Sequence, residues 1–134
     1  MTRTPLRLLL LDPNFVTRIA LTSRLEATGF MVRAEKAAST AARVASGSQW
    51  DLIVASASLP PHDLEAFLET LTMTDCKSIL CVVVEGDDKE RPEIAARFKA
   101  RAIPHPVRPQ ALEEFLAPRA GGSQPQEQAF FRTA

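Results

Sequence analysis

The chain has 134 residues, of which 46% are hydrophobic and 24% are charged, the balance of one ordinary globular domain and not of a disordered chain. The 16 Lys and Arg residues equal the 16 Asp and Glu residues. Without a basic excess, no nucleic-acid partner is indicated. No apolar run has the length of a membrane span, so no membrane association is expected. Two cysteines make no disulfide framework, and we expect a cytoplasmic protein without a cofactor.

Five short apolar runs alternate with five longer segments that have helical features. The runs are Leu6–Leu11, Phe30–Ala34, Leu52–Ala57, Ile79–Val84 and a weak one near Ala102–Ile103. The third and fourth runs are almost continuously apolar, as parallel strands covered on both faces are. This alternation predicts an α/β fold with a parallel sheet.

The helical segments carry start and stop signals. Asn14 can cap a helix that runs to about Thr28, where Gly29 would end it. Further helices are expected over Ala37–Ala45, over Asp63–Thr74, from Asp87 and Asp88 to about Lys99, and over Pro109–Leu116. In the first helix, the apolar residues that recur at helical spacing are Phe15, Val16, Ile19, Ala20, Leu21 and Leu25.

The composition changes after Pro118. Residues 119–134 contain Gly-Gly-Ser, Pro125 and three glutamines, which is typical of a linker. We therefore expect a domain over residues 1–118 and a flexible C-terminal tail over residues 119–134. Phe130 and Phe131 lie near the end of this tail. They are either part of a frayed terminus, or a docking element that binds a partner or folds back on the domain.

The carboxyl ends of the strands hold the candidate functional residues, because ligands bind at that edge of an open parallel sheet. Asp12 and Pro13 follow the first strand, and Ser56 follows the third. Val83 lies near the end of the fourth strand, and His105 follows the fifth.

These features together resemble the receiver domains of bacterial two-component response regulators, of the chemotaxis-regulator type, over about residues 6–117. The resemblance rests on LRLLLLDPN in the first strand and its turn, on R-x-x-L-x-x-x-L-E-x-x-G-F-x-V from Arg18 to Val32, on DLIVASASLP over Asp51–Pro60, and on His105-Pro106 followed by Pro109 and Leu112. It implies a flavodoxin-like (βα)5 three-layer sandwich, with a parallel five-stranded sheet in the order 2-1-3-4-5. It also implies a cis peptide bond before Pro106.

The resemblance further implies that the phosphoacceptor pocket is degenerate. A working receiver has two acidic residues after the first strand and an aspartate phosphoacceptor after the third. It also has a hydroxyl at the end of the fourth strand and a lysine after the fifth. At these places the chain has Asp12, Pro13, Ser56, Val83 and His105. A serine hydroxyl is not ionised at neutral pH, and a single carboxylate is a poor Mg²⁺ site. We therefore expect no aspartyl phosphorylation, no metal site and no enzyme activity.

The hypothesis from the sequence is a stand-alone pseudo-receiver that acts as a signalling adaptor through protein contacts. Partners are expected among histidine kinases, phosphotransferases and other regulators, and a homodimer is left open. By the resemblance, the first helix is the kinase or phosphotransferase face. The fourth helix, fifth strand and fifth helix form the second contact face, with Arg91, Arg97, Arg101 and Arg108 available to an acidic surface.

Two alternatives stay open. The first is a divergent receiver that is still phosphorylated, with Asp12 or Asp63 as the acceptor. The second is a small hydrolase or ligand-binding module that uses Ser56, His105 and Asp12, because a serine, a histidine and an aspartate at one edge of a sheet form a hydrolase constellation.

Overall fold

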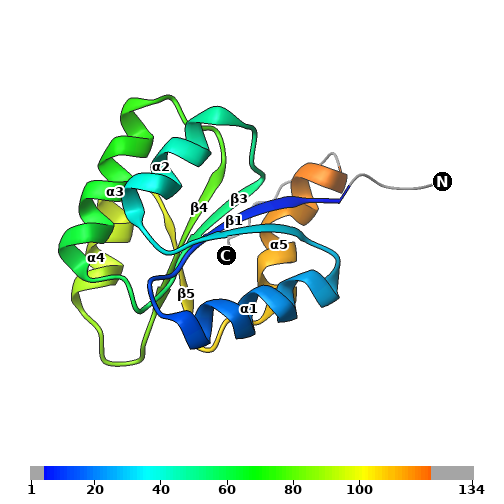
Figure 1. The fold of residues 1–134 in the computed structure, drawn as a ribbon, viewed down its shortest axis with the longest axis horizontal. Coiled ribbons are helices and arrows are strands. Elements are labelled where there is room, and N and C mark those ends of the chain that lie inside the picture. The colour runs from blue at the N-terminus through cyan, green and yellow to red at the C-terminus, as the bar shows by residue number, and fades with distance from the viewer. Residues whose placement is uncertain (1–4, 122–134) are drawn as a thin grey trace.

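The computed structural model describes residues 5–121, with side chains as far as Phe115. Five strands and five helices alternate along the chain (Figure 1): β1 (Arg7–Leu11), α1 (Phe15–Thr28), β2 (Met31–Glu35), α2 (Ala38–Gly47), β3 (Leu52–Ala55), α3 (Pro61–Met73), β4 (Ile79–Val84), α4 (Glu90–Arg97), β5 (Arg101–Pro104) and α5 (Pro109–Gly121). The strands form one parallel sheet in the order β2-β1-β3-β4-β5. The predicted fold class and strand order are confirmed.

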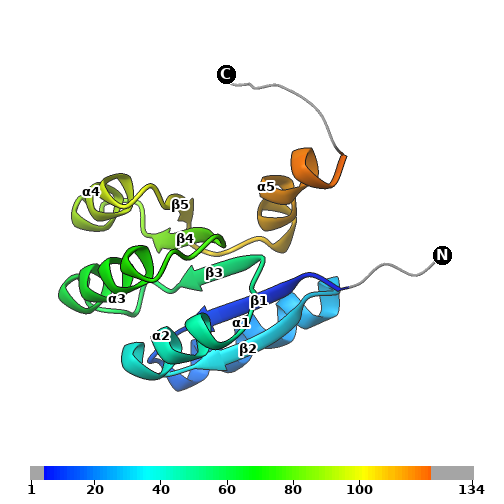
Figure 2. The ribbon, with the colours of Figure 1, turned by 90° about the horizontal axis from the view of Figure 1, so that it is seen from above.

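The sheet is the middle one of three layers. Helices α2, α3 and α4 cover one face, and α1 and α5 cover the other (Figure 1, Figure 2). Successive side chains of β1 alternate between the two cores, so that Leu9 and Leu11 pack under α2 and α3, while Leu8 and Leu10 pack under α1 and α5. All four leucines are fully buried. The apolar run in the sequence therefore reflects a strand that is covered on both faces.

Helix α1 has the caps that the sequence predicts. The side-chain oxygen of Asn14 accepts a hydrogen bond from the Thr17 N–H at 3.0 Å. Gly29 ends the helix at φ 114°, a conformation that residues with a Cβ rarely adopt. Of the helix's side chains, Leu21 and Leu25 are the ones that are buried. The other apolar residues of α1 therefore face away from the core.

Three helices begin at residues other than those expected, and α2 begins at Ala38, one residue after the expected Ala37. Helix α3 begins at Pro61, before the expected Asp63, because a proline in the first turn has no N–H that would lack a partner. Helix α4 begins at Glu90, and the Asp88 carboxylate accepts hydrogen bonds from the N–H groups of Glu90 and Arg91 at 3.0 and 3.1 Å.

Helix α5 extends further than the sequence indicates. It ends at Gly121, past the expected boundary at residue 118, so the first residues of the predicted tail are helical. Phe130 and Phe131 lie outside the described residues, and the remaining extent of the tail stays a prediction.

The strand at the edge of the sheet beside α4 is short. Strand β5 has four residues and pairs with β4 alone, as expected for a strand that contains Pro104. The peptide bond between His105 and Pro106 is cis, which confirms the expectation. No helix within residues 5–121 is both long enough and apolar enough to cross a bilayer.

Candidate functional site

A pocket of about 250 Å³ opens at the carboxyl edge of the sheet, between α1 and the turn that follows β5. It brings together four of the five residues that the sequence assigns to the degenerate phosphoacceptor pocket, namely Asp12, Ser56, Val83 and His105. Its remaining lining comes from Thr17, Ala20, Leu21 and Arg24 of α1, and from Ala57, Ser58, Glu85, Pro106 and Val107. Pro13, the fifth residue, does not line the pocket and is exposed.

Asp12 is fully buried, and its carboxylate serves the start of α1. Oδ1 accepts the Asn14 N–H at 2.9 Å, and Oδ2 accepts the Thr17 hydroxyl at 2.7 Å. The Asp12 carbonyl accepts a bond from Arg18 Nη1 at 2.9 Å. Because both carboxylate oxygens have donors from the chain itself, Asp12 acts here as a structural anchor for the helix N-terminus.

Ser56 has a comparable structural role. Its side chain is buried, and its Oγ accepts the Ser58 N–H at 3.0 Å. This bond shapes the turn between β3 and α3, as serine hydroxyls commonly do in turns. Val83, on the neighbouring strand, is 2% exposed and offers only hydrocarbon to the pocket.

The structure places Ser56, His105 and Asp12 around one pocket without connecting them. The His105 backbone N–H donates to the Val84 carbonyl at 2.9 Å, and the residue is exposed. Within residues 5–121, the side-chain hydrogen bonds of Asp12 and Ser56 go to Asn14, Thr17 and Ser58, and none joins two members of the supposed triad. A Ser-His-Asp hydrolase needs one hydrogen bond between the serine and the histidine and another between the histidine and the aspartate. No geometry on the described residues supports the hydrolase alternative.

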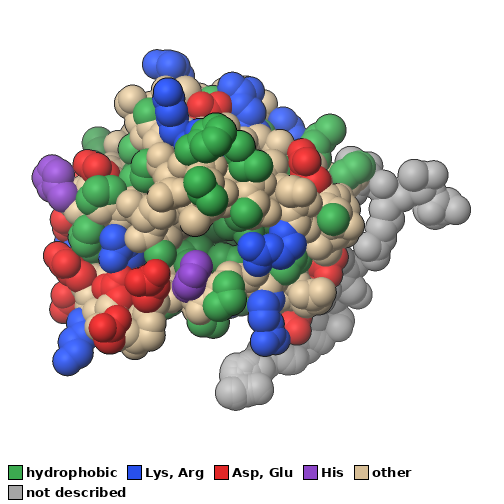
Figure 3. Space-filling view, turned by 60° about the horizontal axis from the view of Figure 1, so that its bottom comes forward, with side chains coloured by type: hydrophobic (Ala, Val, Ile, Leu, Met, Phe, Trp, Pro, Cys, Tyr) green, Lys and Arg blue, Asp and Glu red, His purple; other side chains and the backbone are tan. Residues whose placement is uncertain are grey.

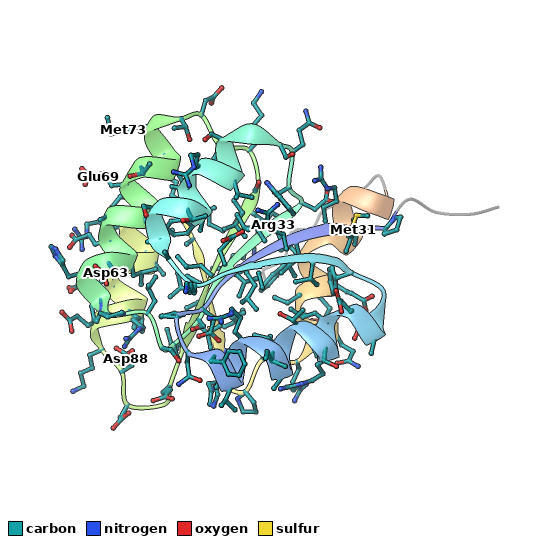
Figure 4. The ribbon with its side chains drawn as sticks, in the orientation of Figure 1. Met31, Arg33, Asp63, Glu69, Met73 and Asp88 are labelled. Atoms are coloured by element: carbon teal, nitrogen blue, oxygen red, sulfur yellow. The ribbon has the colours of Figure 1, made fainter. Side chains whose placement is uncertain are left out.

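Neither the buried thiol Cys81 nor the alternative acceptor Asp63 is placed to react at the pocket. Burial raises the pKa of the Cys81 thiol to about 12, against the opposing effect of the nearby Arg101 charge, so the reactive thiolate is scarce at neutral pH. Asp63, an alternative phosphate acceptor, is exposed on the first turn of α3 and does not line the pocket (Figure 4).

The residues present do not fit a Mg²⁺ ion, the metal that a receiver fold implies. Mg²⁺ requires oxygen ligands in near-octahedral geometry. Both Asp12 oxygens already accept hydrogen bonds, and Pro13 stands where a second carboxylate would be needed. The part of the chain that the structure describes holds no group of three or more His, Cys, Asp or Glu residues suited to a metal.

Because the pocket does not fit a metal, we expect Mg²⁺ at millimolar concentration to change the melting temperature by less than about 1 °C. Scanning calorimetry with Mg²⁺ and with EDTA would measure this. A rise of several degrees with Mg²⁺ would reveal a cation site and contradict the expectation.

Arg91 links two loops on the α4 side of the molecule. Its Nη2 donates to the Leu59 carbonyl at 2.8 Å, and its Nη1 pairs with Asp88 Oδ2 at 2.6 Å. The side-chain bond from Arg91, followed by backbone N–H bonds, lowers the pKa of Asp88. Asp88 lies at the beginning of α4 (Figure 4). We call this arrangement the Arg91 clamp, because it ties the β3–α3 turn to the start of α4.

The other predicted contact arginines are less free than the sequence suggests. Arg97 pairs with Glu65 and lies over the Phe98 ring at 5.6 Å. Arg101 lies over the Phe115 ring at 5.0 Å, and Arg108 is exposed. Because Arg91 and Arg97 already have acidic partners in the chain, the predicted arginine face offers less net charge than four free arginines. Its role as a contact face stays a prediction.

The resemblance assigns the first helix as a partner face, but the sequence analysis did not identify which of its side chains are exposed. Phe15, Val16 and Ile19 are 65%, 71% and 53% exposed, and we call these three residues the α1 outer face. Figure 3 shows hydrophobic side chains gathered on this side of the molecule, beside a hollow with a histidine at its edge. At about 100° per residue, they lie on the opposite side of the helix from Leu21 and Leu25. That angular separation is the signal that could have identified them.

No protein-family model matches the sequence, and no curated protein matches it. Solved structures do match. The signal receiver domain of an HD domain-containing protein from Pseudomonas fluorescens has a TM-score of 0.72 at 18% identity, over 89% of this chain and 97% of that one. The chemotaxis response regulator CheY4 of Vibrio cholerae has a TM-score of 0.70 at 17% identity, over 84% and 97%.

A third match is the receiver domain of the Saccharomyces cerevisiae response regulator Ssk1, solved in complex with the histidine phosphotransfer protein Ypd1. Its TM-score is 0.66 at 13% identity, over 87% of this chain and 90% of that one. All three similarities extend over most of this chain and nearly the whole of the solved domains. The chain therefore has the fold of the response-regulator receiver domains.

Proposed function

We propose that this chain is a receiver-like signalling protein that acts through protein contacts and does not accept a phosphoryl group. The observation that carries the proposal is the hydrogen bonding of the Ser56 hydroxyl. This residue stands at the phosphoacceptor place, and its hydroxyl accepts the Ser58 N–H. A serine needs an adjacent base to become a nucleophile, and no hydrogen bond within residues 5–121 joins it to His105.

The surroundings of Ser56 add to this argument. Phosphoryl transfer requires positioning and charge neutralisation as well as a nucleophile. The carboxylate of Asp12 is engaged by Asn14 and Thr17, so it is not free to hold a cation against the phosphate. Val83 has no hydroxyl with which to bind a phosphoryl oxygen. The nucleophile is therefore weakened at Ser56, the charge neutralisation at Asp12 and the positioning of the phosphoryl group at Val83.

The partner in this proposal is a protein that packs on the α1 outer face. Three large exposed apolar side chains on one side of a helix are typical of an interaction surface. The receiver domain of Ssk1 binds a histidine phosphotransfer protein, and we extend that class of partner to this chain. The proposal includes a cytoplasmic location, with which the free thiols Cys76 and Cys81 are compatible.

The test is phosphorylation by a small-molecule donor. The purified protein is incubated with Mg²⁺ and acetyl phosphate, and its intact mass is then recorded beside that of an ordinary receiver domain treated in the same way. We expect the ordinary receiver to gain a phosphoryl group and this chain to keep its mass.

A stoichiometric adduct that hydroxylamine removes would overturn the proposal, because it would mean that a carboxylate still accepts phosphate. The variants Asp12→Asn and Asp63→Asn would then identify the acceptor, since the adduct disappears only in the variant that lacks it.

A further inference from the structure

We infer that residues 122–134 of this chain dock on the surface made by the α1 outer face and the neighbouring pocket, with one ring of the Phe130–Phe131 pair inside the pocket. These residues lie outside the described part of the chain. The inference goes beyond the proposed function, because docking of this segment does not depend on whether the chain accepts phosphate. A partner on the α1 outer face would have to displace the docked segment.

The surface is suited to an apolar segment. Ala20 lines the pocket and lies one helical turn after Val16, so the α1 outer face borders the pocket where these two residues are neighbours. Leu21, Val83 and Val107 supply hydrocarbon to the lining. A cavity of about 150 Å³ is sufficient for benzene, so the pocket of about 250 Å³ has room for one phenyl ring. It is smaller than the roughly 300–1,000 Å³ of common small-molecule sites.

The segment is long enough to reach the pocket. Helices α1 and α5 both follow parallel strands, so both run from the carboxyl edge of the sheet toward the opposite edge. The pocket therefore lies at the level where α5 begins, and the chain must return by about 20 Å from the end of this 13-residue helix. Phe130 is the ninth residue after Gly121, and nine extended residues span up to about 30 Å.

The charges along this path occur in a complementary order. A chain returning from Gly121 passes Arg24 first, because Arg24 lies two turns further along α1 than Thr17. Arg24 Nη1 donates to the Val107 carbonyl at 3.2 Å, which fixes a positive charge at the rim of the pocket. Glu85 directly follows β4 at the carboxyl edge of the sheet and lines the pocket, so it supplies a negative charge further along the path.

In the segment, Glu127 precedes the phenylalanine pair and Arg132 follows it. With a ring in the pocket, Glu127 therefore comes near Arg24, and Arg132 comes near Glu85. Exposed charge pairs add little affinity, but they select the direction and register in which a segment lies. The phenylalanine ring supplies the binding energy in this arrangement.

The first experiment compares amide NMR spectra of three full-length proteins. They are the wild type, the double variant Phe130→Ala/Phe131→Ala, and the control Gln126→Ala/Gln128→Ala. We expect the phenylalanine variant to shift the amide resonances of Thr17, Ala20, Arg24 and Val107, and the glutamine control to leave them in place. These shifts should be the same at low and high protein concentration.

The second experiment supplies the segment as a separate peptide. A synthetic peptide of residues 122–134 is titrated into the full-length Phe130→Ala/Phe131→Ala protein, and we expect it to return the same resonances toward their wild-type positions. Adding Ile19→Glu to that protein should weaken the peptide's binding by about tenfold or more, because it places a charge on the apolar surface. Met73→Glu, at an 81% exposed position on α3, is the matched control and should change nothing.

Three results would overturn the inference. Identical spectra of the wild type and the phenylalanine variant would mean that the segment does not dock. Shifts confined to another surface would mean that it docks elsewhere. Shifts that grow with protein concentration would assign the segment to a second copy of the chain. Phosphorylation of the protein would overturn the proposed function, but it would not change what any of these three NMR results means for the docking of the segment.

Discussion

The variant Asp12→Ala is expected to lower the free energy of unfolding by about 2–4 kcal/mol. Asp12 is fully buried, and its carboxylate accepts the Asn14 N–H and the Thr17 hydroxyl. Hydrogen bonds to a charged acceptor contribute more to stability than neutral ones, and the substitution leaves two donors without their acceptor. It also removes the anion from the N-terminus of α1.

The direction of this change in the free energy of unfolding distinguishes the chain from a working receiver. Where several carboxylates crowd around a metal site, removing one of them relieves repulsion between like charges. Here Pro13 and Ser56 stand at the places of two of those carboxylates, so the repulsion is largely absent and the loss of hydrogen bonds dominates. Asp12→Asn retains one acceptor oxygen and should have a smaller effect than Asp12→Ala.

Urea unfolding followed by fluorescence measures these differences, since Trp50 is the single tryptophan and is half-buried. The control is Asp63→Ala, at an exposed carboxylate on α3, which should change stability by no more than about 0.5 kcal/mol. An Asp12→Ala protein as stable as the wild type, or more stable, would contradict the structural role of this carboxylate.

Breaking the Arg91 clamp has the second-largest expected effect. Arg91→Ala should lower the free energy of unfolding by about 1–3 kcal/mol at neutral pH, because it leaves the Leu59 carbonyl and the Asp88 carboxylate without the guanidinium. Arg91→Lys should recover little of the loss, since one ammonium group does not reproduce a guanidinium that donates in two directions. Arg33→Ala, which removes the exposed ion pair with Glu35, is the control.

The effect of Arg91→Ala should depend on pH in a defined direction. The clamp lowers the pKa of Asp88 in the folded protein, whereas the unfolded value is about 3.9. The stability that arises from this shift is present above the unfolded pKa and is lost as the pH falls through the folded one. The difference between wild type and Arg91→Ala should therefore be constant above about pH 5 and should shrink below about pH 4.

Urea unfolding of both proteins across this pH range tests the expectation. A stability difference that stays the same down to the lowest accessible pH would mean that the ionised Asp88 carboxylate does not contribute to the clamp.

The strands and the caps of α1 could be predicted from the sequence because their signals are local. The apolar runs of β3 and β4 require burial on both faces, and Gly29 suits the positive φ with which α1 ends. The end of α5 could not be predicted, because Gly-Gly and proline after residue 117 are usual signs of a linker, yet the helix runs to Gly121.

The site could be predicted only in part. Strand ends identify which residues meet at the pocket, and four of the five assigned residues line it. The partners of Asp12 could not be predicted, because a carboxylate next to a strand end suits both a metal site and a helix cap. The Arg91 clamp was also missed, since Leu59 and Arg91 are 32 residues apart and are brought together by the packing of α3 and α4.

The Arg91 clamp also bears on how such a protein would carry information in a cell. It holds the α4 side in one arrangement by contacts among Arg91, Asp88 and Leu59, none of which belongs to the pocket. If phosphorylation does not alter the α4 side, its shape is the same in every molecule. Under the proposed function, the quantity that can then vary is the number of copies of the protein, and the amount of partner it binds would follow that number.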